Sequence, residues 1–238
     1  MALLDKRKPF PDAYNFFRKA FEQDPEYGAA YALAAFALMM QQYVNGVPMT
    51  AALRTEAVKL ADLGAKVSAD DAVALSRAGH VLAYLGHEFD RGATMIEHSI
   101  SLNPNLAVAW QARGWVSIMC GEPDRAIESF EIFTRLAPHD KGIWSGIAFA
   151  HFSLGQYEDG CIAASRALAF FTNILTLVAY IINAALAGRE ADARRAAQQL
   201  LELNPNFRAS HSKEVFSIRS LTTLAEMETA LRLVGVPE

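Results

Sequence analysis

Apolar residues recur along this chain at spacings of three and four, which is the period of one face of an α-helix. The pattern is clear at Ala126, Phe130 and Phe133. Glycine and proline separate such runs: Gly121 follows one apolar run and Pro123 opens the next, as at helix ends and first turns. The pattern predicts helices over residues 11–22, 28–43, 50–66, 71–85, 90–102, 106–119, 123–136, 140–154, 157–170, 173–187 and 190–203.

The helical pattern itself repeats with a period of about 34 residues. Pro104 and Pro138 are 34 residues apart, Thr172 takes the same position 34 residues later, and Pro205 follows after 33. Upstream the spacing is longer, because a turn-rich insertion, YVNGVPMT at 43–50, adds about ten residues. The expected units are a half repeat at 11–25, a repeat with the inserted loop at 28–69, and repeats at 72–104, 107–138, 141–172 and 175–205.

Residue size within each period indicates how the helices pack. Small residues such as Gly79, Gly114 and Ala148 allow two helices to approach closely, and large ones such as Trp110 and Trp144 fill the space between pairs. One pair does not bury its own apolar face, so neighbouring pairs must stack. The predicted fold class is therefore all-α, a right-handed α-solenoid of antiparallel helix pairs.

This pattern resembles the tetratricopeptide repeat (TPR) family, with W-x2-x-x-G…G…A-x3-F-x2-A…P across residues 12–205. A narrower resemblance concerns GHVLAYL at 79–85, GEPDRAIESF at 121–130 and LRLVGVPE at 231–238. These stretches are similar to the repeat region behind the catalytic or DNA-binding domains of bacterial class III adenylate cyclases and winged-helix regulators. The resemblance implies a role in regulation or interaction.

The period fails after Pro205. Residues 207–220 are expected to be partly extended or to form a short helix, and a last helix is expected at 221–234. Thr223 and Glu226 have the spacing of a capping box at its start. Repeat arrays need an end that covers the final apolar face, so 206–238 is interpreted as a C-terminal capping segment.

Composition and charge exclude several functions. The net charge of −4 disfavours nucleic-acid binding by a broad basic face. No apolar stretch reaches about 18 residues, so no membrane span is expected. Met1–Phe10 lacks the apolar region of a secretory signal, and the two cysteines, Cys120 and Cys161, form no disulfide framework. A cytoplasmic location is expected.

No constellation of catalytic residues is found. The six histidines form no HExxH motif or other dense ligand pair, and no glycine run forms a phosphate loop. Gly86, Gly121, Gly155 and Gly188 occupy one repeat position and are expected to end helices. We therefore predict no enzyme activity, no metal and no cofactor.

The concave face of such a solenoid is lined mainly by the first helix of each pair. Here its expected residues are aromatic and aliphatic with few charges, which favours a partner helix or an apolar peptide over an acidic tail. The expected groove residues are Phe36, Met39, Arg77, His80, Tyr84, Gln111, Trp115, Ser145, Phe149, Tyr180 and Asn183. The predicted function is therefore a protein-interaction scaffold, with Trp115, Phe149 and Tyr180 as anchors.

Three alternatives stay open at this point. The groove is filled by the protein's own C-terminal segment, or by a second copy of the chain through self-association. Otherwise the domain is a sensor that binds a small apolar ligand, oriented by Arg77, His80 and Tyr84 near Trp115, and signals to a partner.

Overall fold

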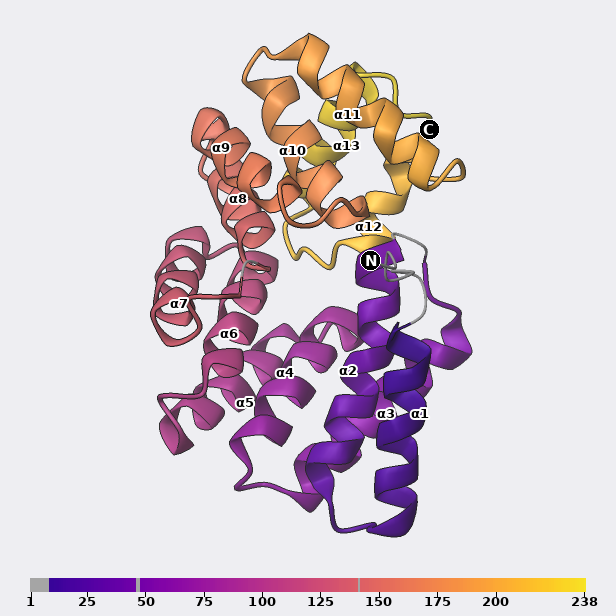
Figure 1. Cartoon of the computed structure of the whole chain (residues 1–238), viewed down its shortest axis with the longest axis vertical. Coiled ribbons are helices and arrows are strands. Elements are labelled where there is room, and N and C mark those ends of the chain that lie inside the picture. The colour runs from indigo at the N-terminus through magenta and orange to yellow at the C-terminus, as the bar shows by residue number, and fades with distance from the viewer. Residues whose placement is uncertain (1–8, 46–47, 141) are drawn as a thin grey trace, which may run out of the picture. The chain divides into compact units, whose positions relative to one another are not determined.

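The computed structural model describes residues 9–45, 48–140 and 142–238. Within these ranges the backbone forms helices and turns and no strand (Figure 1). The described residues divide into two compact units. Unit 1 comprises residues 9–41 and 49–112, and unit 2 comprises residues 42–45, 48, 113–140 and 142–238.

The repeat helices lie where the apolar period predicts them, with ends shifted by a few residues. They are α1 (Pro9–Gln23), α2 (Gly28–Asn45), α3 (Ala51–Val67), α4 (Ala72–Gly86), α5 (Phe89–Leu102), α6 (Ala107–Cys120), α7 (Pro123–Leu136), α8 (Trp144–Ser153), α9 (Tyr157–Leu168), α10 (Ile174–Leu186) and α11 (Glu190–Leu203). The predicted all-α architecture of adjacent helix pairs is confirmed. The division into repeats with the limits given above stays a prediction.

In unit 1, α4 packs against both α3 and α5. The close approach of α4 and α5 requires glycine, because a Cβ atom added at Gly79 would lie 2.6 Å from the carbonyl oxygen of Gly92. The sequence pattern therefore identified Gly79 correctly as a position of close helix contact.

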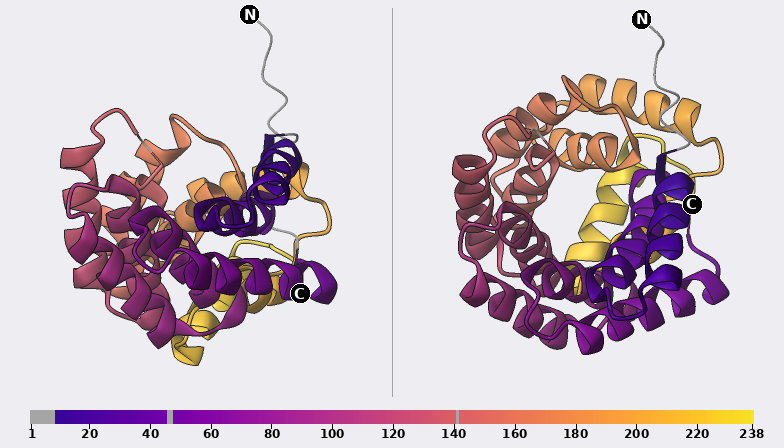
Figure 2. Two further views of the ribbon diagram at one scale, coloured as in Figure 1. Left: turned by 90° about the horizontal axis from the view of Figure 1, so that it is seen from below. Right: turned by 60° about the horizontal axis from the view of Figure 1, so that its bottom comes forward.

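In unit 2, α8 packs against α7, α9 and α10, and α10 also contacts α9 and α11. A last helix, α13 (Leu221–Leu233), packs on α10, so that α10 lies between α11 and α13 (Figure 2). The core of this unit contains the fully buried Phe130, Phe133 and Phe152.

The turns within the helix pairs end with a left-handed residue, as the recurring glycines predict. Gly121, Gly155 and Gly188 have φ between 71° and 82°. The prediction is wrong for Gly86, which is still helical, because His87 takes the left-handed position with φ 56°. Helix α4 therefore ends one residue later than predicted.

The turns between pairs explain the recurrence of Asp or Asn before proline. The side chains of Asp24, Asn103 and Asn204 each accept a hydrogen bond from the backbone N–H two residues later, at 3.1 Å. This short-range bond stabilises a turn where proline prevents the helix from continuing.

Residues 207–220, at the start of the predicted capping segment, have the expected short and partly extended backbone. They contain a 3-10 helix η1 (Ala209–His211), a single turn α12 (Ser212–Val215) and extended residues before α13. The predicted capping box is wrong: α13 begins after Ser220, whose hydroxyl accepts from the backbone N–H of Thr223 at 3.2 Å.

Some predictions concern residues outside the described ranges. The absence of a secretory signal rests on Met1–Phe10, most of which is not described, and the inserted loop includes residues 46–47, which are not described either. The part of the insertion that is described begins differently from the prediction, because α2 continues through Tyr43 to Asn45. Among the described helices, none is long and apolar enough to cross a membrane.

Candidate functional site

Three aromatic side chains of unit 2 meet in one cluster. They come from the C-terminal end of α2, from α6 and from α8. Trp115 of α6 lies edge-on to Tyr43 from the last turns of α2, with ring centroids 5.3 Å apart, and to Phe149 of α8, at 6.3 Å. We call Tyr43, Trp115 and Phe149 the aromatic wall. Sequence reasoning named Trp115 and Phe149 but missed Tyr43, because Tyr43 stands at the start of the predicted loop.

The C-terminal segment lies directly on the aromatic wall. The ring of Phe216 packs against that of Phe149 with centroids 5.5 Å apart. The backbone N–H of Arg219 donates to the carbonyl oxygen of Met119 at 2.9 Å. The side-chain amide of Gln42 donates to the carbonyl oxygen of Glu214 at 2.8 Å. Residues 214–219, which we call the covering segment, thus contact the ends of α2 and α6 through backbone hydrogen bonds and α8 through a ring contact, with Val215 and Ser217 buried as well.

The wall is buried in this structure, with Trp115 packed on Phe130 of α7 as well as on Tyr43 and Phe149. Trp115 is 7% exposed and Phe149 is 3% exposed. Within unit 2 the protein's own C-terminal segment packs on Phe149, while the occupant of the predicted groove stays a prediction. Phe216 has no helical period around it, so no sequence signal placed it in the site.

Unit 1 holds a second group of predicted site residues. The guanidinium of Arg77 lies 4.0 Å from the ring centroid of Phe36, a cation–π geometry, and the same ring lies 5.7 Å from that of His80. His80 is buried, and burial together with the positive charge of Arg77 lowers its pKa to about 3. At neutral pH His80 is therefore an uncharged ring in the core, as is usual for a buried histidine.

His80 makes stability depend on pH in a defined direction. Its pKa is about 3 when folded and about 6.5 when unfolded, so between these values the unfolded chain binds more protons. The stability present above pH 6.5 is lost as pH falls, by about 2 kcal/mol at pH 5 for this one group. Urea denaturation at pH 7 and pH 5 should show that His80→Gln removes this part of the loss.

The matched control for this measurement is His98→Gln, because His98 is exposed. This variant should keep the full difference between pH 7 and pH 5. Equal pH dependence in the wild type and the His80→Gln variant would contradict the assignment of a neutral, buried His80.

The other predicted groove residues lie in two environments. Met39, Tyr84, Ser145 and Asn183 are buried, with Met39 and Asn183 at 0% exposure. Gln111 and Tyr180 are partly exposed. The burial of these side chains does not show whether they contact a partner protein. Their role in partner binding stays a prediction.

Asn183 and Tyr180 connect helices within unit 2. The amide of Asn183 donates to the carbonyl oxygens of Ala148 at 3.1 Å and Ala179 at 2.8 Å, and so joins α10 to α8. Burial and the charge of Asp192 on α11 raise the pKa of Tyr180, which places that phenol beside α11. Both side chains have a packing role that the repeat position alone did not indicate.

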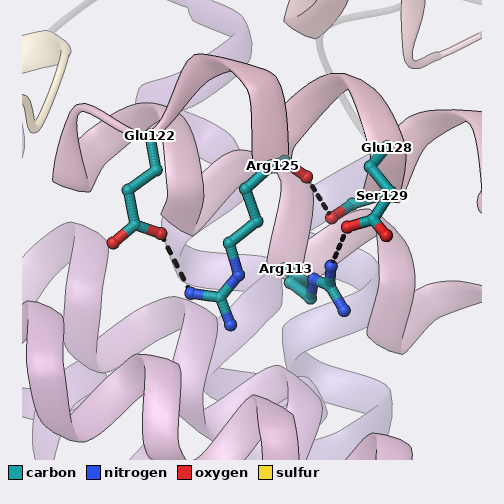
Figure 3. A network of polar contacts seen from close by, with 5 residues as sticks. All are labelled: Arg113, Glu122, Arg125, Glu128 and Ser129. Carbon is teal, nitrogen blue, oxygen red and sulfur yellow. Dashed lines mark hydrogen bonds and ion pairs between the residues drawn. The ribbon is translucent and has the colours of Figure 1, made fainter.

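Polar contacts also join α6 to α7 (Figure 3). Arg113 forms an ion pair with Glu128, and Arg125 donates to Glu122 at 2.9 Å. Because Glu128 is 61% exposed, such a pair contributes less than about 1 kcal/mol. The Arg113–Glu128 pair links α6 to α7, and the Arg125–Glu122 pair lies at the first turn of α7.

Other features give little support for chemistry. In the part of the chain that the structure describes, no three His, Cys, Asp or Glu side chains are placed to hold a metal ion. Cys161 is buried, which raises the pKa of its thiol to about 11 and disfavours the reactive thiolate. A cavity of about 580 Å³ in unit 1 is lined by residues 67–73, Asn103 and Leu106, all in turns or at helix ends.

The pairing of helices and their turns define a TPR-like fold. No protein-family model and no curated protein matches the sequence.

Solved structures with this fold are similar to the chain over most of its length. Pseudomonas aeruginosa PilF has a TM-score of 0.55 and 19% identity, covering 88% of this chain and 90% of that chain. A double mutant of MamA from RS-1 has a TM-score of 0.53 and 18% identity, covering 86% and 97%. The APC/C hetero-tetramer Cut9-Hcn1 gives a TM-score of 0.66 and 14% identity, covering 93% of this chain and 40% of that chain.

These neighbours are TPR proteins, so the predicted fold is supported at the level of the repeat type. The narrower resemblance to the repeat regions of adenylate cyclases and winged-helix regulators receives no support from them.

Proposed function

We propose that this chain is a non-catalytic protein-interaction scaffold that binds a helix or peptide segment of another protein through the apolar surface of its first helices. The anchors are Trp115 and Phe149 in unit 2.

The observation that carries this proposal is that the aromatic wall already binds a piece of protein. Residues 214–215 end the single turn α12 and residues 216–219 are non-helical, and this segment is held by a ring contact to Phe149 and by hydrogen bonds from Gln42 and to Met119. A surface that orders a segment of this kind has the apolar area and the polar groups that peptide recognition requires.

Two further points favour binding over catalysis. The buried titratable groups His80 and Cys161 are each held in the uncharged form at neutral pH. In addition, one structure of similar fold, Cut9-Hcn1, is that of a hetero-tetramer, so this fold is compatible with assembly.

The proposal is tested by Phe149→Leu in a pull-down from extracts of the source organism, followed by titration of the recovered partner. Leucine keeps most of the apolar volume, so the fold should persist, while the loss of the ring edge should weaken binding about tenfold. Far-UV circular dichroism verifies that the helix content is unchanged.

Phe170→Leu is the matched control, because Phe170 is 53% exposed in the same unit and does not belong to the wall. Equal partner affinity in both variants would refute the wall as the binding surface. A small molecule retained by the purified chain in native mass spectrometry would instead favour the sensor alternative.

A further inference from the structure

We propose that the covering segment, residues 214–219, is an autoinhibitory ligand of the aromatic wall, and that the partner displaces it with a peptide segment of the same kind, a short turn followed by an aromatic residue in place of Phe216. This inference rests on the proposed function, because it names the partner class and the regulation of the same surface.

The covering segment is held by backbone hydrogen bonds and by its buried side chains Val215, Phe216 and Ser217. Both hydrogen bonds use its backbone, the carbonyl group of Glu214 and the N–H of Arg219. Only Phe216 supplies a ring to the wall. Glu214 lies in the single turn α12 and the chain is non-helical from Phe216 onward, so a foreign segment that replaces these contacts needs a short turn followed by an aromatic residue.

The attachment of the rest of the C-terminal region is separate from these contacts. Upstream, the N–H of Ala209 donates to the carbonyl oxygen of Pro237 at 2.7 Å, and Phe207 is fully buried. Downstream, α13 packs on α10. Each end of the covering segment therefore has its own anchor, and residues 214–219 can leave the wall without the release of α13.

These contacts define the chemistry of the partner. It presents an aromatic side chain, a free carbonyl group two residues before it and a free N–H three residues after it, the spacings of Glu214, Phe216 and Arg219. A regular helix has its carbonyl and N–H groups paired internally, whereas here the carbonyl of Glu214 comes from the single turn α12 and the N–H of Arg219 from the non-helical residues after it. The inference thus narrows the helix-or-peptide proposal to a peptide with a short turn followed by a non-helical stretch.

The test uses a fluorescein-labelled peptide of residues 212–220 (SKEVFSIRS) as the probe and the full chain as the receptor. In the wild type the internal segment competes with the peptide and lowers its apparent affinity. Phe216→Ala in the chain weakens the competitor, so the peptide should bind with a Kd at least about tenfold lower than for the wild type.

Two control variants make the result specific. Lys213→Ala changes an exposed residue beside the covering segment and should leave the peptide Kd at the wild-type value. The double variant Phe149→Leu/Phe216→Ala should bind the peptide with a Kd about tenfold higher than the Phe216→Ala variant does. The peptide's own phenylalanine then lacks its ring partner.

Hydrogen exchange on the wild-type chain gives a measurement that needs no variant. If the covering segment opens by itself, the N–H of Arg219 exchanges faster than the core N–H groups of α10. Exchange of both groups only in global unfolding would overturn the proposal, as would a Phe216→Ala chain that no longer folds.

Equal peptide affinity in the wild type and a folded Phe216→Ala variant would also refute autoinhibition. A wild-type dimer in light scattering that becomes monomeric in the Phe216→Ala variant would show that a second copy supplies the segment, which contradicts a foreign partner.

The proposed function fails separately, when the natural partner binds the Phe149→Leu chain normally. If Phe216→Ala leaves the partner's affinity unchanged while Phe149→Leu lowers it, the scaffold function stands and the autoinhibition does not.

Discussion

Phe130→Ala is expected to lower the free energy of unfolding by about 3–5 kcal/mol. The ring of Phe130 is 0% exposed and lies edge-on to Trp115, with centroids 5.8 Å apart. It also fills the space between two glycines: a Cβ atom added at Gly114 or Gly146 would lie 2.5 Å from a carbon of this ring. Removal of the ring therefore leaves a cavity shared by α6, α7 and α8.

Urea denaturation followed by circular dichroism measures this loss. Phe170→Ala is the control, because its ring is 53% exposed and its removal should change stability by less than about 0.5 kcal/mol. A loss below about 1 kcal/mol for Phe130→Ala would contradict the packing described for this ring.

A double-mutant cycle tests the fit between Phe130 and Gly146 more directly. Gly146→Ala alone should destabilise by about 1–3 kcal/mol, because the new methyl group overlaps the ring. In a Phe130→Leu background the same change should cost less, since leucine leaves room beside α8. Additive effects would show that the two residues do not share this space.

Gly160→Ala is expected to lower the free energy of unfolding by about 2–4 kcal/mol. A Cβ atom at this position would overlap the side-chain oxygen of Asn183, which is fully buried. Asn183 must then move, and its hydrogen bonds to Ala148 and Ala179 are broken without water to replace them. The gain in helix propensity from glycine to alanine, about 1 kcal/mol, offsets only part of this loss.

The comparison for this measurement is Gly86→Ala, at the end of α4. The nearest atom to an added Cβ there is 3.4 Å away, so alanine should be neutral or stabilising. In an Asn183→Ala background the cost of Gly160→Ala should largely disappear. A stabilising effect of Gly160→Ala in the wild-type chain would contradict the close contact with Asn183.

Much of the fold is predictable because each repeat encodes its helices locally. The apolar period gives the faces, and Gly121, Gly155 and Gly188 give the helix ends, since only a residue tolerant of a left-handed backbone fits there. The error at Gly86 has the same origin: His87 adopts this conformation, at a cost that a sequence pattern does not reveal.

The candidate site was less predictable, because repeat position indicates a face but not what covers it. Trp115 and Phe149 were identified as lining residues, and the structure brings them together with Tyr43. The cover comes from Phe216, more than 60 residues further along the chain in a segment without periodicity. A contact between residues so distant in sequence leaves no local pattern.

The hydrogen bond from Arg219 to Met119 has a consequence for the end of α6. The carbonyl group of Met119 lies in the last turn of that helix, where no following helical N–H can pair with it. A ligand that displaces residues 214–219 without its own donor at this point would leave α6 frayed. Occupancy of the surface and order in the last turn of α6 are therefore reciprocally linked. A change that stabilises the last turn of α6 should strengthen binding at this surface, and binding should stabilise that turn.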